Sequence, residues 1–429
     1  MVSDQLLDVL PRTAERDADG RLAIGGVALA DVAAEFGTPA FVVDEQGLRE
    51  TAREYLDAFT SRHADTDVHF ASKALPCAPV TSILAEEGLG CDVASAGELA
   101  IALAAGFDPE HILLHGNAKS DIDIQAALDA RVGLVVIDGP DDVDRLERLA
   151  AEPQRVLLRI NPAVPGETHM AMDTGSPEAK FGIALEEAPA LLERIAAAKQ
   201  LELLGLHVHI GSQLLDLDGF GRAAEAIATL GRFPVYDLGG GLGIAYRPEE
   251  RAPSIADYAQ VTVDALHTHL DPDARLIVEP GRSVVGRSMV TLYEVVTVKR
   301  GALTHVAVNG GMGDNLEPML YGQRFAPAIV DEDRSTEICE LVCHHCESGD
   351  VLVHGAELAT PERGDLLVMP VTGAYCYSLQ NNYNGARKPP VVICRDGDAR
   401  LAVRRERIED LLARDVDVAG NAGERQRQQ

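Results

Sequence analysis

The chain has 429 residues, of which 46% are hydrophobic and 25% charged, so it is long enough to bury a large core as an ordinary globular protein. Its 38 basic and 68 acidic residues give a formal net charge of −30 at pH 7. So acidic a surface argues against nucleic acid or an anionic membrane as a partner. No apolar run reaches the roughly 18 residues that a membrane helix needs, and we expect no membrane span.

The N-terminal residues and the cysteines indicate the cellular compartment of the protein. The first residues have no basic region followed by an apolar region, and they are therefore not expected to form a secretory signal peptide. Seven cysteines are an odd number in a long chain, which favours reduced thiols and a cytoplasmic protein. The polar residues 416–429 are expected to form a flexible tail.

In chain order, the predicted elements begin with a strand-like run at 40–44 and continue as an alternation of strands and helices. Stretches such as 96–105, 141–151 and 219–230 have the apolar spacing of helices. The eight β-rich runs with which such stretches alternate are 68–73, 89–94, 112–116, 134–138, 156–162, 203–211, 235–241 and 275–281. Eight such units predict a (β/α)8 barrel, which we place at 46–283.

The pattern changes beyond the barrel, where strand-like runs follow one another with few helices between them. These runs are 289–299, 305–309, 350–356, 365–370 and 390–395. We expect a second, mostly β domain at 284–415, joined by the N-terminal segment 1–45. The predicted fold class is therefore α/β, a (β/α)8 TIM barrel with a C-terminal β domain.

Polar side chains end seven of the eight runs, where a purely structural turn would not require them, and glycines end the eighth. Active sites of (β/α)8 barrels lie at this C-terminal mouth, so we expect the side chains to meet around one cavity. The residues at the eight ends are Lys73, Asp92, His115, Asp138, Arg159, His209, the glycines 239–241 and Glu279.

Several of these ends suit a phosphorylated cofactor. A buried amine at a barrel mouth, such as that of Lys73, is expected to have a depressed pKa and to form a Schiff base. In the run Asp-Leu-Gly-Gly-Gly-Leu-Gly at 237–243, consecutive glycines let backbone N–H groups approach a phosphate, and the spacing is not that of a dinucleotide site. The carboxylate of Glu279 can accept a hydrogen bond from a protonated ring nitrogen.

Two histidine-containing segments leave alternatives open. His207 and His209 lie on one face of a strand, and an imidazole there either stacks on a flat cofactor or belongs to a pair of core or metal-linked histidines. A group of cysteines and histidines at 339–346 could indicate zinc, but a second Cys-x-x-Cys pair is missing. We expect no metal there and interpret Cys-Glu-Ser-Gly-Asp at 346–350 as a loop that presents a thiol.

Together, these motifs resemble those of the alanine-racemase-like (fold type III) enzymes that use pyridoxal 5'-phosphate (PLP), and within them the diaminopimelate decarboxylases. The resemblance covers about residues 25–415, with its motifs in the order of the family. The motifs are Ala71-Ser-Lys-Ala, His209-Ile-Gly-Ser, Asp237-Leu-Gly-Gly-Gly-Leu-Gly, Glu279-Pro-Gly-Arg, His345-Cys-Glu-Ser-Gly-Asp and Thr372-Gly-Ala-Tyr.

The resemblance implies that Lys73 attaches PLP covalently, that His209 stacks on the ring and that Glu279 pairs with the ring nitrogen. We also expect Asp92 and Arg159 to contribute to the cofactor site. The residues that would hold the phosphate are Ser212, Gly240, Gly241, Glu279, Gly281, Arg282 and Tyr375.

The resemblance also implies a homodimer with shared active sites, because Cys346 as proton donor and Glu347 as substrate contact would reach in from the partner subunit. Within one subunit, the implied substrate contacts are Arg282, Glu317, Tyr321 and Tyr375. The implied reaction is the decarboxylation of meso-2,6-diaminopimelate to L-lysine.

One departure affects the substrate, because the family usually carries Arg where this chain has Glu317. Arg clamps a carboxylate through two hydrogen bonds, whereas Glu repels it. A basic amino acid, or one from a specialised pathway, is therefore the alternative substrate. The further alternatives are a racemase, against which the Cys346 loop argues, and a catalytically dead PLP-binding regulator, against which the presence of both Lys73 and Cys346 argues.

Overall fold

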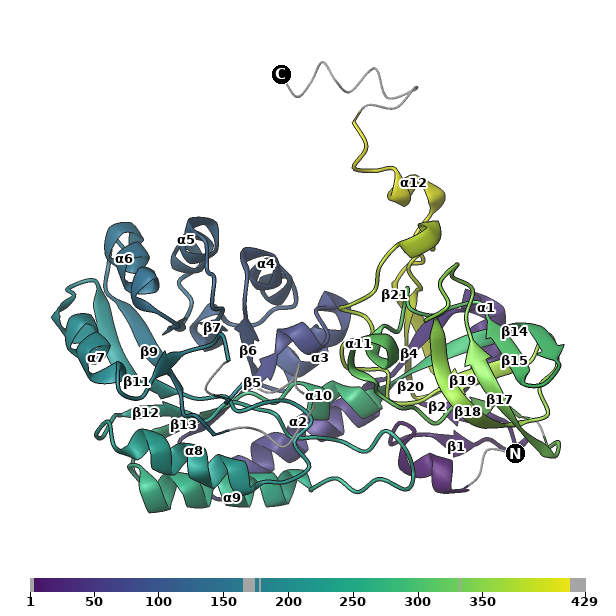
Figure 1. Ribbon diagram of the computed structural model, residues 1–429, viewed down its shortest axis with the longest axis horizontal. Helices are drawn as coiled ribbons and strands as arrows, with labels where there is room; N and C mark the ends of the chain where they lie inside the picture. Colours follow the sequence, from purple (N-terminus) through teal and green to yellow (C-terminus); the bar gives the residue numbers. More distant parts are fainter. Residues whose placement is uncertain (1–3, 165–173, 177–178, 332, 417–429) are drawn as a thin grey trace.

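The computed structural model describes residues 4–164, 174–176, 179–331 and 333–416. Eight parallel strands form a closed barrel, because β13 pairs with β5 and β8 pairs with β9 (Figure 1). All eight predicted runs are confirmed as strands. They are β5 (Thr66–Ala71), β6 (Gly90–Val93), β7 (Ile112–Leu114), β8 (Leu134–Ile137), β9 (Gln154–Asn161), β11 (Leu201–His207), β12 (Val235–Asp237) and β13 (Arg275–Val278).

Helices surround the barrel and cover the outward faces of its strands (Figure 1). Side-chain caps fix several helix starts: Ser120 and Ser254 each form a reciprocal capping box with an aspartate three residues later. The helices are α2 (Glu45–Thr60), α3 (Ala78–Glu86), α4 (Ala96–Ala104), α5 (Asp121–Ala130), α6 (Pro140–Leu149), α7 (Ala188–Ala197), α8 (Asp218–Ala228) and α9 (Ile255–His269).

The barrel interior is packed and is not a channel. A separate cluster of inward-facing apolar side chains fills it, and strand alternation sends their neighbours outward to the helices. The inward cluster consists of Leu113, Leu134, Val136, Leu157, Val235 and Ile277. Because these residues close the barrel, polar side chains at the strand ends lie on a solid floor.

A separate sheet region follows the barrel, as predicted, with strand order β18-β17-β15-β14-β4-β20-β21 and with β19 paired to β14 and β16. Its central strand β4 (Ala40–Asp44) comes from the N-terminal segment and is buried along its whole length. The other strands are β14 (Met289–Arg300), β15 (Thr304–Val308), β16 (Ala328–Ile329), β17 (Thr336–Val342), β18 (Val351–Ala359), β19 (Leu366–Met369), β20 (Val391–Arg395) and β21 (Asp398–Val403).

Shorter elements complete the described chain. They are η1 (Asp4–Asp8), β1 (Glu15–Arg16), β2 (Leu22–Ile24), β3 (Val27–Ala28), α1 (Leu29–Phe36), η2 (Ser72–Ala74), η3 (Pro109–His111), β10 (Ile183–Ala184), α10 (Arg282–Val285), η5 (Gly286–Ser288), α11 (Glu317–Tyr321), η6 (Tyr383–Gly385) and α12 (Ile408–Leu411).

The expected domain boundaries and the expected C-terminal tail are not tested by the structure. The domain limits 46–283 and 284–415 stay predictions. The expected tail 416–429 lies, apart from its first residue, outside the described residues. Within the described ranges, no helix combines the length and the apolar character that crossing a membrane would take. The seven cysteines all lie in described segments and are free thiols.

Candidate active site

A cavity of about 380 Å³ opens at the C-terminal ends of the barrel strands. Most of the predicted site residues line it together, including Lys73, which belongs to η2 directly after β5. The full lining is Ala71, Lys73, Asp92, Arg159, Thr174, Lys180, Phe181, His209, Ser212, Gly241, Leu242, Glu279, Gly281, Arg282, Tyr321 and Tyr375. The strand-end pattern therefore brings residues from across the barrel to one site.

The protonation of Lys73 differs from the sequence-based expectation of a depressed pKa. Desolvation in the cavity lowers the pKa of Lys73, but the nearby Asp92, Tyr375 and Glu279 outweigh it and raise the pKa above the usual value. Desolvation and the charge of Glu279 in turn raise the pKa of Asp92 to about 6. The Lys73 side chain is exposed to the open cavity, and acidic neighbours hold its amine as an ammonium. The expectation of a buried amine with a depressed pKa was therefore wrong, because it left these neighbours out.

Glycines form one wall of the cavity where the backbones of neighbouring strand ends nearly touch. A Cβ on Gly240 would lie 1.9 Å from the carbonyl oxygen of Glu279, and one on Gly241 would lie 2.3 Å from that of Gly211. Gly241 also has a φ of +115°, which side chains rarely allow. Only glycine therefore fits this turn.

The predicted residues of this wall differ in what they do. Gly241, Gly281 and Ser212 line the cavity, but the Gly240 N–H donates a hydrogen bond to Nδ1 of His209 at 3.1 Å. Burial and the Lys73 charge hold the pKa of His209 well below its usual range, so its imidazole is neutral. Gly240 therefore fixes the orientation of the His209 ring.

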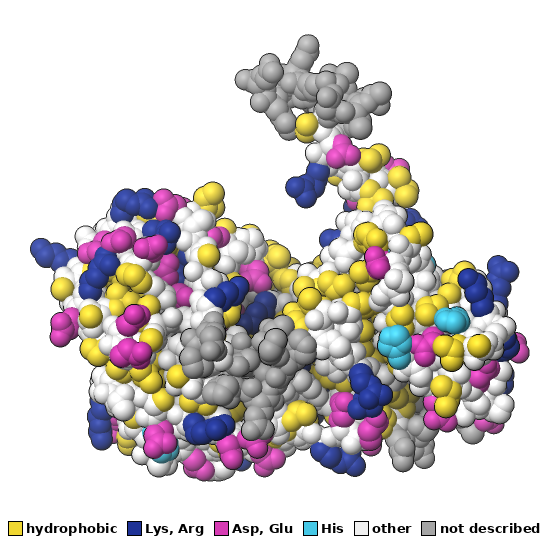
Figure 2. Space-filling view, viewed as in Figure 1, with side chains coloured by type: hydrophobic (Ala, Val, Ile, Leu, Met, Phe, Trp, Pro, Cys, Tyr) yellow, Lys and Arg dark blue, Asp and Glu magenta, His cyan; other side chains and the backbone are white. Residues whose placement is uncertain are grey.

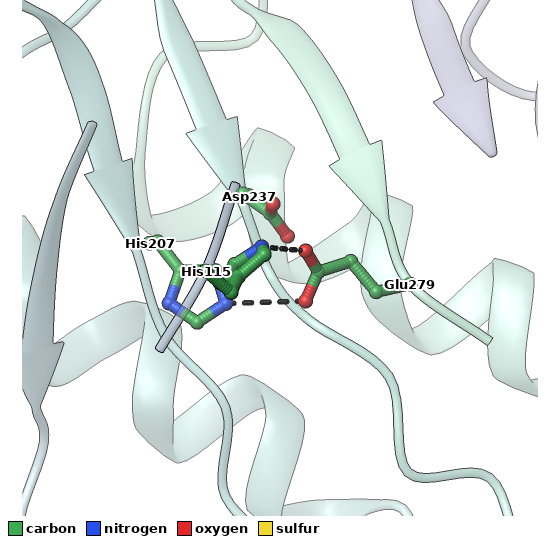
Figure 3. Close-up of side chains that lie close together, drawn as sticks. All are labelled: His115, His207, Asp237 and Glu279. Carbon is green, nitrogen blue, oxygen red and sulfur yellow. Dashed lines mark hydrogen bonds and ion pairs between the residues drawn. The ribbon is translucent and has the colours of Figure 1, made fainter. Parts of the chain in front are cut away.

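Glu279 forms the floor of the site together with His115, His207 and Asp237 (Figure 3). Nε2 of His115 lies 2.5 Å from Oε1 of Glu279, and Nε2 of His207 lies 3.2 Å from Oε2. All four residues are buried, and their polar atoms lie within 4.8 Å of one another. Both oxygens of the Glu279 carboxylate are thus paired with histidines.

Arg282 lines the same cavity. Its Nη1 is 3.3 Å from Oε2 of Glu317 and is hydrogen-bonded to the hydroxyl of Tyr246. Its guanidinium lies over the ring of Tyr375, 4.6 Å from the centroid. Glu317 is 1% exposed and does not line the cavity, so it contacts Arg282 from behind.

Cys346 and Glu347 lie outside this cavity, in an exposed loop of the sheet region between β17 and β18. The loop is well fixed: the Cys346 N–H donates to Oδ1 of Asn384, and Asp350 accepts from both the N–H and Nδ1 of His345. One chain by itself does not bring Cys346 or Glu347 to Lys73. Their part in the site therefore stays a prediction that needs a second subunit.

The sequence pattern missed several residues of the site. Thr174, Lys180 and Phe181 line the cavity, and the Phe181 ring lies 4.5 Å below the guanidinium of Arg159 and 5.0 Å below the ammonium of Lys180. Tyr246 supports Arg282. None of them ends a barrel strand; the only available signal for Tyr246 was its position shortly after the glycine run.

A protein-family model identifies the class of enzyme to which the chain belongs. Residues 46–286, more than half of the chain, match the family described as pyridoxal-dependent decarboxylase, pyridoxal binding domain. This chain belongs to the pyridoxal-dependent decarboxylases. It is 45% identical to a protein of Actinosynnema pretiosum subsp. auranticum named diaminopimelate decarboxylase, covering 92% of this chain and 93% of that one. It is 41% identical to the Mycobacterium tuberculosis protein of that name, covering 95% and 98%.

Solved structures of pyridoxal-dependent decarboxylases agree with the fold. The diaminopimelate decarboxylase of M. jannaschii, in co-complex with L-lysine, has a TM-score of 0.89 and 29% identity, over 95% of this chain and 98% of that one. The Helicobacter pylori enzyme, also complexed with L-lysine, has a TM-score of 0.85 and 31% identity, over 90% and 98%. The chain is thus a carboxy-lyase of this family.

The cavity fits the family's cofactor. PLP carries a phosphate, an aldehyde and a basic ring nitrogen. Gly241, Gly281 and Ser212, which follow β12, β13 and β11, offer a close backbone approach beside Arg282, and this suits the phosphate. The amine of Lys73 suits the aldehyde, and the anionic Glu279 suits the ring nitrogen. These three features belong to one cavity.

Proposed function

We propose that this protein decarboxylates meso-2,6-diaminopimelate to L-lysine and CO2 with PLP as cofactor, in the cytoplasm, as a homodimer. The observation that carries the proposal is one cavity whose lining combines the Lys73 amine, glycines beside Arg282 and the carboxylate of Glu279. The names of relatives that are 41–45% identical over nearly the whole chain support the substrate. The seven free thiols support a reducing compartment.

In this proposal each residue at the cofactor has a defined task. Lys73 attaches PLP, with Asp92 holding the proton of its amine before attachment, and the neutral His209 presents a flat face to the ring. Glu279 accepts a hydrogen bond from the ring nitrogen. The phosphate contacts are Ser212, Gly241, Gly281, Arg282 and Tyr375, with Arg159 completing the wall, while Gly240 contributes by orienting the His209 ring.

PLP, when bound, supplies a ring that accepts the electron pair left by the departing carboxylate. The chain supplies orientation and a proton. Cys346 of the partner subunit gives its thiol proton to the carbon that has lost CO2. Arg282, Tyr321 and Tyr375, with Glu347 of the partner subunit, hold the rest of the substrate so that the scissile bond stands perpendicular to the ring.

A second substrate class is favoured by the pairing of Glu317 with Arg282. A guanidinium already paired with a buried carboxylate is a weaker partner for the distal carboxylate of diaminopimelate. An amino acid with a distal amine, such as lysine or ornithine, avoids that competition. This candidate keeps the same cofactor, the same Lys73 and the same reaction.

Two measurements test the attachment and the reaction. Borohydride reduction of the holoenzyme followed by peptide mapping is expected to place PLP on Lys73, and wild-type protein that takes up no cofactor would refute the proposal. CO2 release from diaminopimelate, lysine, ornithine and arginine then ranks the substrates. Inverted product chirality without CO2 would support a racemase, and trapped PLP without turnover a regulator.

Subunit mixing tests the shared site. Lys73→Ala and Cys346→Ala are each expected to lack activity. In hybrid dimers, one of the two sites combines a wild-type Lys73 with a wild-type Cys346, so random equimolar mixing restores about a quarter of the sites. No recovery in verified hybrids would mean that both residues act within one subunit or that Cys346 has no role.

A further inference from the structure

The buried carboxylate of Glu279 is held by two imidazoles from different strands (Figure 3). His115 follows β7 directly and His207 ends β11, so the barrel itself fixes both rings. One histidine contacts each oxygen, at 2.5 Å and 3.2 Å, and the two ring centroids lie 4.8 Å apart at an angle of 63°. This arrangement fixes the plane of the carboxylate as well as its position.

The protonation states follow from burial. Desolvation lowers the pKa of His207 to about 3, so at neutral pH it carries one ring proton. Since Nε2 faces the carboxylate and Nδ1 has no hydrogen-bond partner in the described part of the chain, that proton belongs on Nε2. His207 is therefore a neutral donor to Glu279.

Asp237 lies against the same carboxylate and accepts a hydrogen bond from the Gly239 N–H at 2.8 Å. Burial and the charge of Glu279 raise the pKa of Asp237 well above its usual range, so Asp237 is neutral. Burial alone would also raise the pKa of Glu279, but His115 and His207 outweigh it and hold that pKa well below its usual range. The negative charge of the pair stays on Glu279.

We propose that His115 and His207 are positioning residues that keep Glu279 ionised and aim its carboxylate at the cofactor's ring nitrogen. The inference rests on the proposed function, since it assigns the support of a residue that binds the cofactor. A buried carboxylate without donors takes up a proton. A protonated Glu279 would donate a hydrogen bond to the ring nitrogen. The ionised Glu279 instead accepts a hydrogen bond from the protonated ring nitrogen.

The other charged groups at the site do not replace the histidines. The same cavity is lined by three other charged residues, Lys73, Asp92 and Arg159. Their charges shift the pKa values of neighbouring groups. Apart from the neutral Asp237, which also contacts Glu279, the interactions found with the Glu279 oxygens in the described part of the chain are those of His115 and His207. Removing the two imidazoles therefore removes the contacts that offset the burial of the Glu279 carboxylate.

The test compares Leu and Gln at both positions. Gln keeps an amide donor at a reach similar to that of Nε2, whereas Leu removes it. The readouts are the nitrogen-15 chemical shift of ring-labelled PLP in the holoenzyme and the dissociation constant of PLP. We expect His115→Leu and His207→Leu to move the ring signal towards the unprotonated form, to weaken PLP binding by about tenfold or more, and to lower kcat more than they change KM. The Gln variants are expected to recover most of each change.

A second measurement needs no folded Leu variant. Imidazole nitrogen-15 spectra of the wild-type holoenzyme, assigned with the Gln variants, are expected to show His207 as a neutral ring with its proton on Nε2. A proton on Nδ1, or a charged ring, would overturn the inference. So would Leu variants that fold and keep the wild-type ring signal. If wild-type protein fails to bind PLP, it is instead the proposed function that fails.

Discussion

Oε2 of Glu317 lies 3.3 Å from Nη1 of Arg282, and both side chains are buried. The hydroxyl of Tyr246 contacts both groups, so the three side chains form one unit behind the cavity wall. Burial raises the pKa of Glu317, and Arg282 counteracts this shift. A ligand that approaches Arg282 therefore meets a cation whose charge is already largely balanced.

We predict that Glu317→Arg shifts preference towards a substrate with a distal carboxylate. The variant removes the competing carboxylate and adds a second guanidinium, so KM for diaminopimelate should fall by about tenfold or more. KM for lysine should rise. Steady-state kinetics on both substrates check this, with the exposed Glu294→Arg as a control for the charge change. Unchanged KM values in a folded Glu317→Arg protein would contradict the prediction.

Gly240→Ala is predicted to weaken PLP binding by about tenfold or more. The added Cβ would lie 1.9 Å from the backbone oxygen of Glu279, so the end of β13 must shift, at a cost of roughly 1–3 kcal/mol. Titration of the apoenzyme with PLP measures the effect. The control is Gly221→Ala in α8, where a Cβ has nothing within 4 Å and the helix should gain about 0.5–1 kcal/mol. Wild-type affinity in Gly240→Ala would show that the turn adapts.

Buried histidines should give the fold an acid-sensitive component. His69 in β5 is 2% exposed, and desolvation lowers its pKa to about 4. The unfolded chain takes up this proton below about pH 6.5, whereas the folded chain does so only near pH 4. The stabilisation is complete above pH 6.5 and is lost as pH falls from 6.5 to 4, an effect of about 3 kcal/mol.

His69→Leu should therefore flatten the decline of the melting temperature between pH 7 and pH 4, measured against wild-type protein. His207 contributes in the same window, so part of the decline should remain. The exposed His305→Leu is the control and should leave the slope unchanged. A His69→Leu profile parallel to that of the wild type would mean that His69 is already charged in the fold.

The net charge of −30 predicts a dependence on salt. Figure 2 shows acidic and basic side chains interspersed on the face in view, and the excess of acidic residues in the chain causes a net repulsion between surface charges. Raising KCl from about 0.1 to about 1 M shortens the screening length from roughly 10 to 3 Å and weakens this repulsion. We expect the melting temperature to rise by several degrees.

The matched variant for the salt dependence carries Gln at three exposed acidic positions, Glu152, Glu202 and Glu225. It should melt higher than wild type at low salt and gain less from added KCl. A melting temperature that does not change with KCl would show that repulsion between surface charges contributes little to stability.

The barrel was predictable because its strands are short apolar runs that end in polar residues, and this pattern also located Lys73, Arg159 and Glu279. Strands β17 and β21 were missed, since exposed residues interrupt their apolar pattern. The raised pKa of Lys73 depends on its proximity to Asp92, which only the folded chain establishes. Lys180 and Tyr246 reach the site from loops, where no periodicity marks a residue.

Strand β4 lies between β14, which runs antiparallel to it, and β20, which runs parallel to it. Its partner β20 ends at Arg395, so on the ribosome the apolar strand at 40–44 is made long before its neighbour exists. Until then, the apolar strand β4 has an unpaired edge with which other chains can pair. For this reason we expect nascent or truncated chains that stop short of residue 391 to be prone to aggregation, however well the barrel strands have paired.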